Sequence, residues 1–201
     1  MKAKNILVVL GAVLLLFLTA FAATNKFASA QAGNVGDTGE QAAAVDYFLE
    51  IDGVEGESTD DRHRGEIDIE SWSWGETNSG AGASGGGGGA GKVSMQDFHF
   101  TKNYDKASPK LFLAVATGEH YKTATLSARK SGGDHQEYLV IKLSDVIITS
   151  YQTGGNNGEV PMEQVSMNFA KIEFEYRPQL PDGSLDAPVK AGWDLKANKK
   201  I

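Results

Sequence analysis

The chain lacks cysteine altogether and has no excess of positive charge. Without cysteine it cannot form a disulfide framework, a thiolate zinc site, an iron–sulfur cluster or a cysteine nucleophile. Its 19 basic side chains are outnumbered by 26 acidic ones, which gives a formal net charge of −7 at pH 7. Proteins that bind nucleic acid depend on basic side chains that neutralise phosphates, so we expect no nucleic-acid partner.

The sequence also lacks the residue arrangements that carry common catalytic and metal chemistry. Its four histidines, at positions 63, 99, 120 and 135, form no pair at the spacing of helical metal ligands, and no HExxH motif is present. The Gly-x-Ser-x-Gly motif of a nucleophile elbow is absent. We therefore expect no catalytic residue, no metal site and no cofactor. An enzyme would need a hidden site among the histidines and the acids of the polar loops.

A glycine-rich stretch at residues 75–91 contains two motif matches that we reject. Gly80-x-Gly82-x-x-Gly85 fits a dinucleotide fingerprint. Residues 86–92, which begin with Gly86 and end with Gly91 and Lys92, fit most of a phosphate-binding loop. The phosphate loop requires Ser or Thr after the lysine, where Val93 stands, and both motifs require a helix to follow, whereas a strand pattern begins here. The stretch is predicted to be a flexible connection between two strands.

The N-terminal residues have the order of a secretory signal. Lys2 and Lys4 precede an uncharged apolar stretch at residues 6–23, and small residues follow at 28–30. Residues 1–30 are therefore predicted to be a signal peptide cleaved after Ala30. The apolar stretch is also near the lower length limit for spanning a bilayer, so an uncleaved membrane anchor is the alternative. Residues 31–44 are predicted to be a flexible lead-in, and residues 45–201 the folded domain.

Alternation of apolar and polar residues dominates the chain from Val45 onward. On residues 45–51 every second side chain is apolar, the pattern of a half-buried strand. Six further runs are predicted to be strands: residues 66–74, 93–101, 122–129, 136–143, 146–152 and 165–177. Turn residues separate most of these runs and no βαβ alternation is present, so the residues alone predict an antiparallel sandwich or barrel.

Two segments depart from simple alternation. Ser108 is predicted to be the N-cap of a short helix, with Pro109 at its first position and Gly118 as its stop. The run 165–177 is apolar on one face in its first half and on the other face in its second half. Such a strand either bends between two sheets at a bulge or has one half covered by another subunit.

Five segments, in this order along the chain, resemble the Hcp (haemolysin-coregulated protein) family of type VI secretion tube proteins. The resemblance covers nearly all of residues 45–200 and is more specific than any short motif. The matching segments include VDYFLEIDGVEGESTDDRHRGEIDIESWSWG and GKVSMQDFHFTKNYDKASPKLFLAVATGEHY, and they span residues 45–75, 91–121, 128–155, 165–178 and 187–200.

The resemblance implies a mainly β fold, an antiparallel β-barrel-like sandwich of two sheets with one flanking α-helix. It also implies that six copies form a ring and that rings stack into a hollow tube. In the family a contractile sheath propels the tube, a spike protein sits at its tip, and small effector proteins are carried in its lumen. The family is structural rather than enzymatic, so the implied partners are the chain itself, effectors, spike and sheath.

The resemblance also implies roles for individual residues. The loop at residues 53–65 is similar to the family's extended loop, which reaches the adjacent ring; the alternative is a solvated hairpin. Ser73 matches a lumen-facing serine that contacts cargo, although a small residue fitted between two tryptophans is the alternative. Trp72 and Trp74 are expected to pack in the core or between subunits. The predicted ring-stacking residues are Glu57, Ser58, Thr59, Asp60, Asp61, Arg62, His63 and Arg64.

The leader is a departure from the family, because most members begin near the first strand. If the general export pathway carries this chain, it is expected to form extracellular tubes or fibres, or rings in the periplasm. An uncleaved leader predicts a membrane-anchored protein, and a wrongly assigned start codon predicts a cytoplasmic protein before injection. A discrete ring that acts as a carrier or binding module, without long stacking, also stays open.

Overall fold

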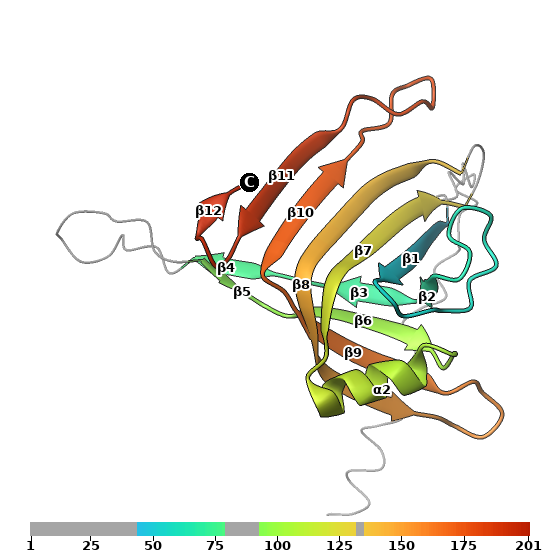
Figure 1. The fold of residues 1–201 in the computed structure, drawn as a ribbon. Helices are drawn as coiled ribbons and strands as arrows, with labels where there is room; N and C mark the ends of the chain where they lie inside the picture. The colour runs from blue at the N-terminus through green and yellow to red at the C-terminus, as the bar shows by residue number, and fades with distance from the viewer. Residues whose placement is uncertain (1–43, 79–92, 132–134) are drawn as a thin grey trace, which may run out of the picture. The chain divides into compact units, whose positions relative to one another are not determined.

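The computed structural model describes residues 44–78, 93–131 and 135–201, which all lie in one compact unit, Ala42–Ile201 (Figure 1). The predicted leader, residues 1–30, and all but Ala44 of the predicted lead-in lie outside the described residues, as do residues 79–91 of the glycine-rich stretch. In the described part of the chain, no helix is long and apolar enough to cross a membrane.

The described residues contain twelve strands and one helix. In chain order they are β1 Val45–Ile51, β2 Ile67–Ile69, β3 Ser71–Ser73, β4 Glu76–Asn78, β5 Val93–Met95, β6 Phe98–Asn103, α2 Ser108–Thr117, β7 His120–Lys130, β8 Glu137–Gly154, β9 Met162–Asn168, β10 Lys171–Tyr176, β11 Val189–Asp194 and β12 Lys199–Lys200.

All the strand pairs are antiparallel, and the long strand β8 organises them. Its first part pairs with β7 and β10, in a sheet of order β12-β11-β10-β8-β7-β1-β2, and its last part pairs with β9, which continues to β6 and β3 (Figure 1). A single residue, Glu70, separates β2 from β3, and β2 also contacts β6. We call the strands β12, β11, β10, β7, β1 and β2 with the first part of β8 one wing of the sheet, and β3, β6 and β9 with the last part of β8 the other. At Glu70 the chain passes from the first wing to the second, which gives the barrel-like form. The hairpin β4–β5 is the second sheet.

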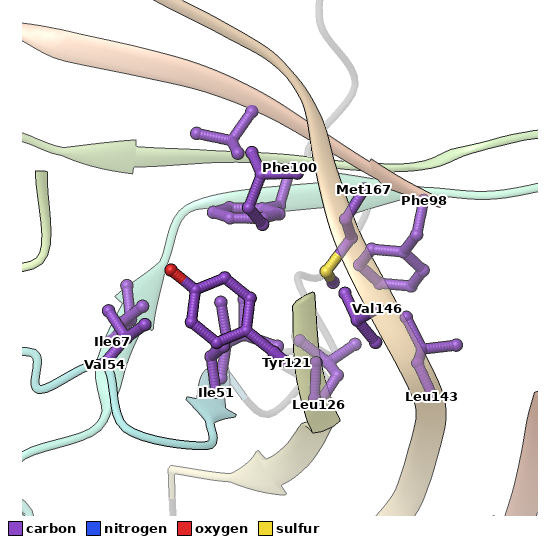
Figure 2. Packing of buried hydrophobic residues seen from close by; sticks show 14 of the residues in the cluster. Ile51, Val54, Ile67, Phe98, Phe100, Tyr121, Leu126, Leu143, Val146 and Met167 are labelled. Atoms are coloured by element: carbon purple, nitrogen blue, oxygen red, sulfur yellow. The ribbon is translucent and has the colours of Figure 1, made fainter. Parts of the chain in front are cut away.

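The core lies between the two wings. Figure 2 shows buried side chains from both wings directed into the same space, among them Phe98 and Met167 from one wing and Leu126 and Leu143 from the other. Helix α2 buries Leu111 and Ala114 in the same cluster and packs against β8. The predicted fold, two antiparallel sheets with one helix, is confirmed.

Several predicted strand boundaries are wrong because pairing between strands, rather than the local residue pattern alone, decides where a strand begins and ends. The run 165–177 is two strands, β9 and β10, which pair with opposite ends of β8 and are separated at Phe169 and Ala170. Its two apolar faces thus belong to two strands of one ten-stranded sheet, so the predicted bend is present but is a break between strands rather than a bulge between two sheets. Conversely, 136–143 and 146–152 are one strand, β8, which continues through Asp145 although that residue has a positive φ of 55°. The runs 66–74 and 93–101 are each divided in two, and residues 76–78, assigned to the flexible stretch, form β4.

The helix begins one residue earlier than predicted. Ala107, not Ser108, is the N-cap, and Ser108 is buried in the first turn. Asp105 replaces the missing cap, since its Oδ1 accepts a hydrogen bond of 2.9 Å from the backbone N–H of Ala107. The predicted stop is confirmed, because Gly118 adopts the left-handed conformation with φ 69°.

A buried ion-pair network fixes the start of the helix to the sheet. Lys102 Nζ, which is fully buried, lies 2.8 Å from Glu163 Oε2 and 2.7 Å from Asp105 Oδ1. It also donates to Ser108 Oγ at 3.0 Å and to the carbonyl of Asn103 at 2.7 Å. Every proton of the ammonium group has an acceptor, so the charge is compensated where water does not reach.

Candidate functional site

The loop between β1 and β2, residues 52–66, has a defined structure of its own. Its two arms are joined by backbone hydrogen bonds from Gly56 to Gly65 at 2.8 Å, from Ser58 to Glu66 at 3.0 Å, and from Gly65 to Ser58 at 2.9 Å. The arms approach so closely that a Cβ at Gly56 would lie 2.2 Å from the Glu66 carbonyl oxygen. These bonds give the loop a defined backbone conformation.

Asp60 holds the tip of this loop in place. Its Oδ1 accepts a hydrogen bond of 2.8 Å from Arg129 Nη1, and its Oδ2 forms an ion pair with Arg129 Nη2 at 2.5 Å. The Oδ1 atom also accepts hydrogen bonds from the backbone N–H groups of Arg62 at 2.9 Å and His63 at 3.2 Å. The bonds from Arg129 keep the pKa of the Asp60 carboxyl well below its usual range. The carboxylate is therefore charged at neutral pH and bonded on both oxygens.

Arg129, Asp60, His63 and Phe48 together form a clamp that holds the loop, and the ring of Phe48, on β1, is its apolar support. The His63 imidazole stacks on it at a centroid distance of 4.3 Å and an interplanar angle of 6°, and the Arg129 guanidinium carbon lies 5.1 Å from its centroid. His63 Nδ1 also lies 3.0 Å from the Glu66 carboxylate. Burial raises the pKa of Glu66, while the bond to His63 acts in the opposite direction.

Burial divides the predicted ring-stacking residues into two groups. Ser58 and His63 are buried within the subunit and Asp60 is half-buried, so these three anchor the loop and offer little surface to another ring. Their assignment as direct contacts between rings stays a prediction, which this burial does not favour. The side chains exposed at the loop surface are Glu57, Thr59, Asp61, Arg62 and Arg64. Their role in stacking stays a prediction.

Sequence reasoning missed the two anchoring residues outside the loop, Phe48 and Arg129. Arg129 was assigned only to the strand run 122–129, yet it is just 5% exposed. A buried arginine needs an acid partner, but Arg129 shares its strand face with the polar residues Thr125 and Ser127, so the strand pattern gave no signal of its burial. Its partner Asp60 lies 69 residues away in the sequence and could not be identified from spacing.

A second candidate surface is the outward face of β3, β6, β9 and the last part of β8. Across these strands Ser73 lies opposite His99, and Ser166 lies opposite both His99 and Ser150. His99 Nδ1 and Ser166 Oγ are 2.7 Å apart. The hollow on this face has a volume of about 490 Å³, and the outward side chains that line it are uncharged hydroxyls, amides and one imidazole: Ser71, Ser73, His99, Thr101, Ser150, Gln152, Gln164 and Ser166.

The side chains on either side of Ser73 point away from this hollow face and pack inside. Trp72 stacks on Phe98 with centroids 5.7 Å apart, and it meets Tyr47 edge-on at 6.2 Å. Trp74 lies 5.5 Å from the ring of Phe174. Both indoles are half-buried, whereas Ser73 is exposed. The strand thus presents the serine on the polar face.

The histidines do not gather into a common site. His63 pairs with Glu66, His99 with Ser166, and His120 with Asp145 at 3.2 Å, while His135 contributes its backbone carbonyl to Arg62. Within residues 44–78, 93–131 and 135–201, no three His, Asp or Glu side chains lie together as a metal ion would require. The expectation of a non-catalytic protein stays a prediction.

Comparisons with known proteins point in one direction. The family profile described as "Type VI secretion system effector, Hcp" matches residues 48–176. Protein hcp1 of Pseudomonas aeruginosa is 53% identical over 158 residues, which cover 77% of this chain and 98% of that protein.

Solved structures agree with the sequence matches. A structure titled as that of a type six secretion system protein is 32% identical, covers 79% of this chain and 100% of its own, and superposes with a TM-score of 0.74. Hcp1 from Salmonella typhimurium is 35% identical, with coverage of 79% and 99% and a TM-score of 0.64. The similarity includes the loop and the hollow face, because the matched profile begins at Phe48 and ends at Tyr176.

Proposed function

Because the chain belongs to the Hcp family of type VI secretion system proteins, we propose that it is a structural subunit whose copies close into hexameric rings and stack into a hollow tube. The observation that carries the proposal is the β1–β2 loop, an ordered projection that presents five exposed polar or charged side chains. An anchored loop of this kind can contact another copy without first having to be ordered.

The surface of the single subunit supports assembly. Phe112 and Leu113 on α2 are 56% and 53% exposed, and Val189 on β11 is 63% exposed. Strand β12 pairs only with the end of β11, at Trp193 and Asp194. Along residues 189–191, the edge of β11 that faces away from β10 pairs with no described strand. Neighbouring copies in a closed ring would cover apolar side chains and a free strand edge that a monomer leaves in water.

Reversing the exposed charges of the loop tests the stacking role. The variant Asp61→Lys/Arg62→Glu/Arg64→Glu is expected to keep rings intact and to shorten or abolish tubes, because it changes only side chains at the loop surface. Its free energy of unfolding is expected to stay within about 0.5 kcal/mol of the wild-type value. Light scattering on a sizing column measures ring mass, and negative-stain micrographs measure tube length.

The exposed Lys122 provides a control for this test. Lys122→Glu, a charge reversal outside the loop, is expected to leave tube length unchanged. Tubes of wild-type length from the loop variant would exclude the loop from ring stacking, and a strictly monomeric wild-type protein would exclude the ring itself.

The intact mass of protein recovered from the culture supernatant shows whether residues 1–30 have been removed. Their removal would favour an exported tube over one assembled in the cytoplasm.

The polar hollow face supports a second part of the proposal, contact with a cargo protein through Ser73. Its hydroxyl and amide groups can each donate and accept hydrogen bonds, so they can bind either donors or acceptors on a polar partner surface. Ser73→Lys is expected to release a small protein that co-purifies with wild-type rings, because it places an unpaired charge on this face. Thr77→Lys, on exposed β4, is the matched control and is expected to retain it. Retention of the same protein by Ser73→Lys rings would argue against cargo contact at this face.

A further inference from the structure

We propose that Arg129, which lies on β7 outside the stacking loop, is a positioning residue that orders this loop for contact between rings; this inference rests on the stacking function proposed above. Its Nη1 donates a hydrogen bond of 2.8 Å to Asp60 Oδ1, and its Nη2 forms an ion pair with Asp60 Oδ2 at 2.5 Å. Asp60 in turn accepts the backbone N–H groups of Arg62 and His63. A continuous series of bonds thus runs from the sheet, through one carboxylate, to the backbone that carries the exposed arginines.

The geometry makes Arg129 a fixed point rather than a mobile surface cation. The residue is 5% exposed, its guanidinium lies over Phe48, and a further carboxylate oxygen, from Asp46, is 3.7 Å away. Planar two-pronged pairing restricts direction as well as distance. The position of Asp60, and with it the turn at residues 60–63, is therefore set by β7.

His63 closes the same clamp from the loop side. Its ring stacks on Phe48, which the Arg129 guanidinium also contacts, and its Nδ1 meets the Glu66 carboxylate. Arg64, next in sequence, is exposed. From position 60 to 64 the loop thus holds two anchored residues, Asp60 and His63, and three exposed charged residues between and after them. This arrangement lets the fold hold the backbone while it presents charged side chains outward.

Order in the free subunit matters for assembly because each contact between rings has to offset the entropy of the groups it immobilises. Fixing one residue's backbone costs roughly 1–2 kcal/mol of conformational entropy. A loop already held by Arg129 would lose little of this freedom when rings meet. A loop released from Arg129 keeps every exposed side chain and yet would stack poorly.

Arg129→Met is a suitable test because it should act locally. Methionine retains a long apolar side chain against Phe48 but cannot bond Asp60. The Asp60 side chain is 17% exposed, so water can reach its carboxylate and the rings are expected to remain folded. Arg129→Lys keeps the charge and loses the two-pronged geometry, so it is expected to give an intermediate result. Arg177→Met removes an exposed arginine paired with Glu175 and is the control.

Trypsin reports the order of the loop directly, since it cleaves after Arg62 and Arg64. In dilute rings, Arg129→Met is expected to be cleaved at these sites at least about tenfold faster than wild type, which corresponds to about 1.4 kcal/mol of lost local stability. Backbone amides of residues 60–66 are expected to exchange faster to the same degree. Arg177→Met is expected to match wild type in both measurements.

Tube length then separates a positioning role from a merely structural one. Arg129→Met rings are expected to form shorter tubes although their loop-surface residues are unchanged, with partial recovery in Arg129→Lys. Equal cleavage rates in Arg129→Met and wild type would overturn the proposal, and so would faster cleavage with tubes of normal length. If Arg129→Met fails to form rings, Arg129→Lys decides by the same criteria. Long tubes from the charge-reversed loop variant would instead show that the stacking function itself is wrong.

Discussion

Replacing Lys102 with methionine is expected to lower the free energy of unfolding by about 3–5 kcal/mol, the cost of breaking a buried ion pair by removing one partner. Lys102 and Glu163 are both fully buried, and their charged groups lie 2.8 Å apart. Methionine fills much of the space of the lysine stem but leaves the Glu163 carboxylate without a cation. Thermal and chemical denaturation of the purified protein measure the loss.

The same substitution is expected to loosen the start of α2, because the helix depends on Glu163 as well. Glu163 accepts a hydrogen bond of 2.8 Å from Ser108 Oγ and another from the Tyr151 hydroxyl. Burial, together with the bond to Glu163, raises the pKa of Tyr151, so the phenol stays a donor at neutral pH. Hydrogen exchange over residues 108–117 should therefore be faster in Lys102→Met than in wild type.

Two further variants separate charge from packing. Lys102→Met/Glu163→Met removes both charges and is expected to recover at least half of the loss, since an apolar pair avoids an uncompensated carboxylate. Lys106→Met breaks an exposed pair with Glu55 and is expected to have no measurable effect. If Lys102→Met were as harmless as Lys106→Met, the network would not be holding the helix to the sheet.

The Lys102 network shows where prediction from sequence stops. Strand β1 was predicted with its observed limits, Val45–Ile51, because alternation is a local property of the residues involved. Lys102 could not be recognised as buried, because its partner Glu163 lies 61 residues away and comes alongside only when β6 pairs with β9. The strand β8 was divided at Asp145 for a similar reason. Local turn residues predicted a break, whereas pairing to β7 and β10 keeps the strand continuous.

The candidate site was predictable to a similar extent. The loop and Ser73 were identified by resemblance to a family, and the mixed charge of the loop was visible in the residues themselves. What the sequence did not indicate was the division between anchoring and exposed side chains. That division arises from Arg129 and Phe48, which lie on two adjacent, paired strands and meet Asp60 and His63 only in the folded unit. Composition describes what a loop carries, but tertiary contacts decide which side chains remain available.

Gly56→Ala is expected to destabilise the subunit by about 3 kcal/mol and to disorder the stacking loop. A Cβ at this position would lie 2.2 Å from the Glu66 carbonyl oxygen and 2.7 Å from the Ile67 Cα. Both neighbours are backbone atoms, so no side chain can turn aside to make room. The two arms must separate, which breaks the bonds from Gly56 to Gly65 and from Ser58 to Glu66. Chemical denaturation measures the first effect, and trypsin cleavage in the loop measures the second.

Gly154→Ala is the matched control, because a Cβ there meets no atom within 4 Å. It is expected to be neutral or slightly stabilising, since alanine restricts the unfolded chain more than glycine does. If Gly56→Ala proved equally neutral, the close approach of the two arms would not limit the loop, and its order would depend on the clamp at Arg129 alone. If Gly56→Ala lost stability but Arg129→Met did not, the arms at the base of the loop would be the main source of order. Comparing the two variants therefore distinguishes a loop ordered from its base from one ordered at its tip.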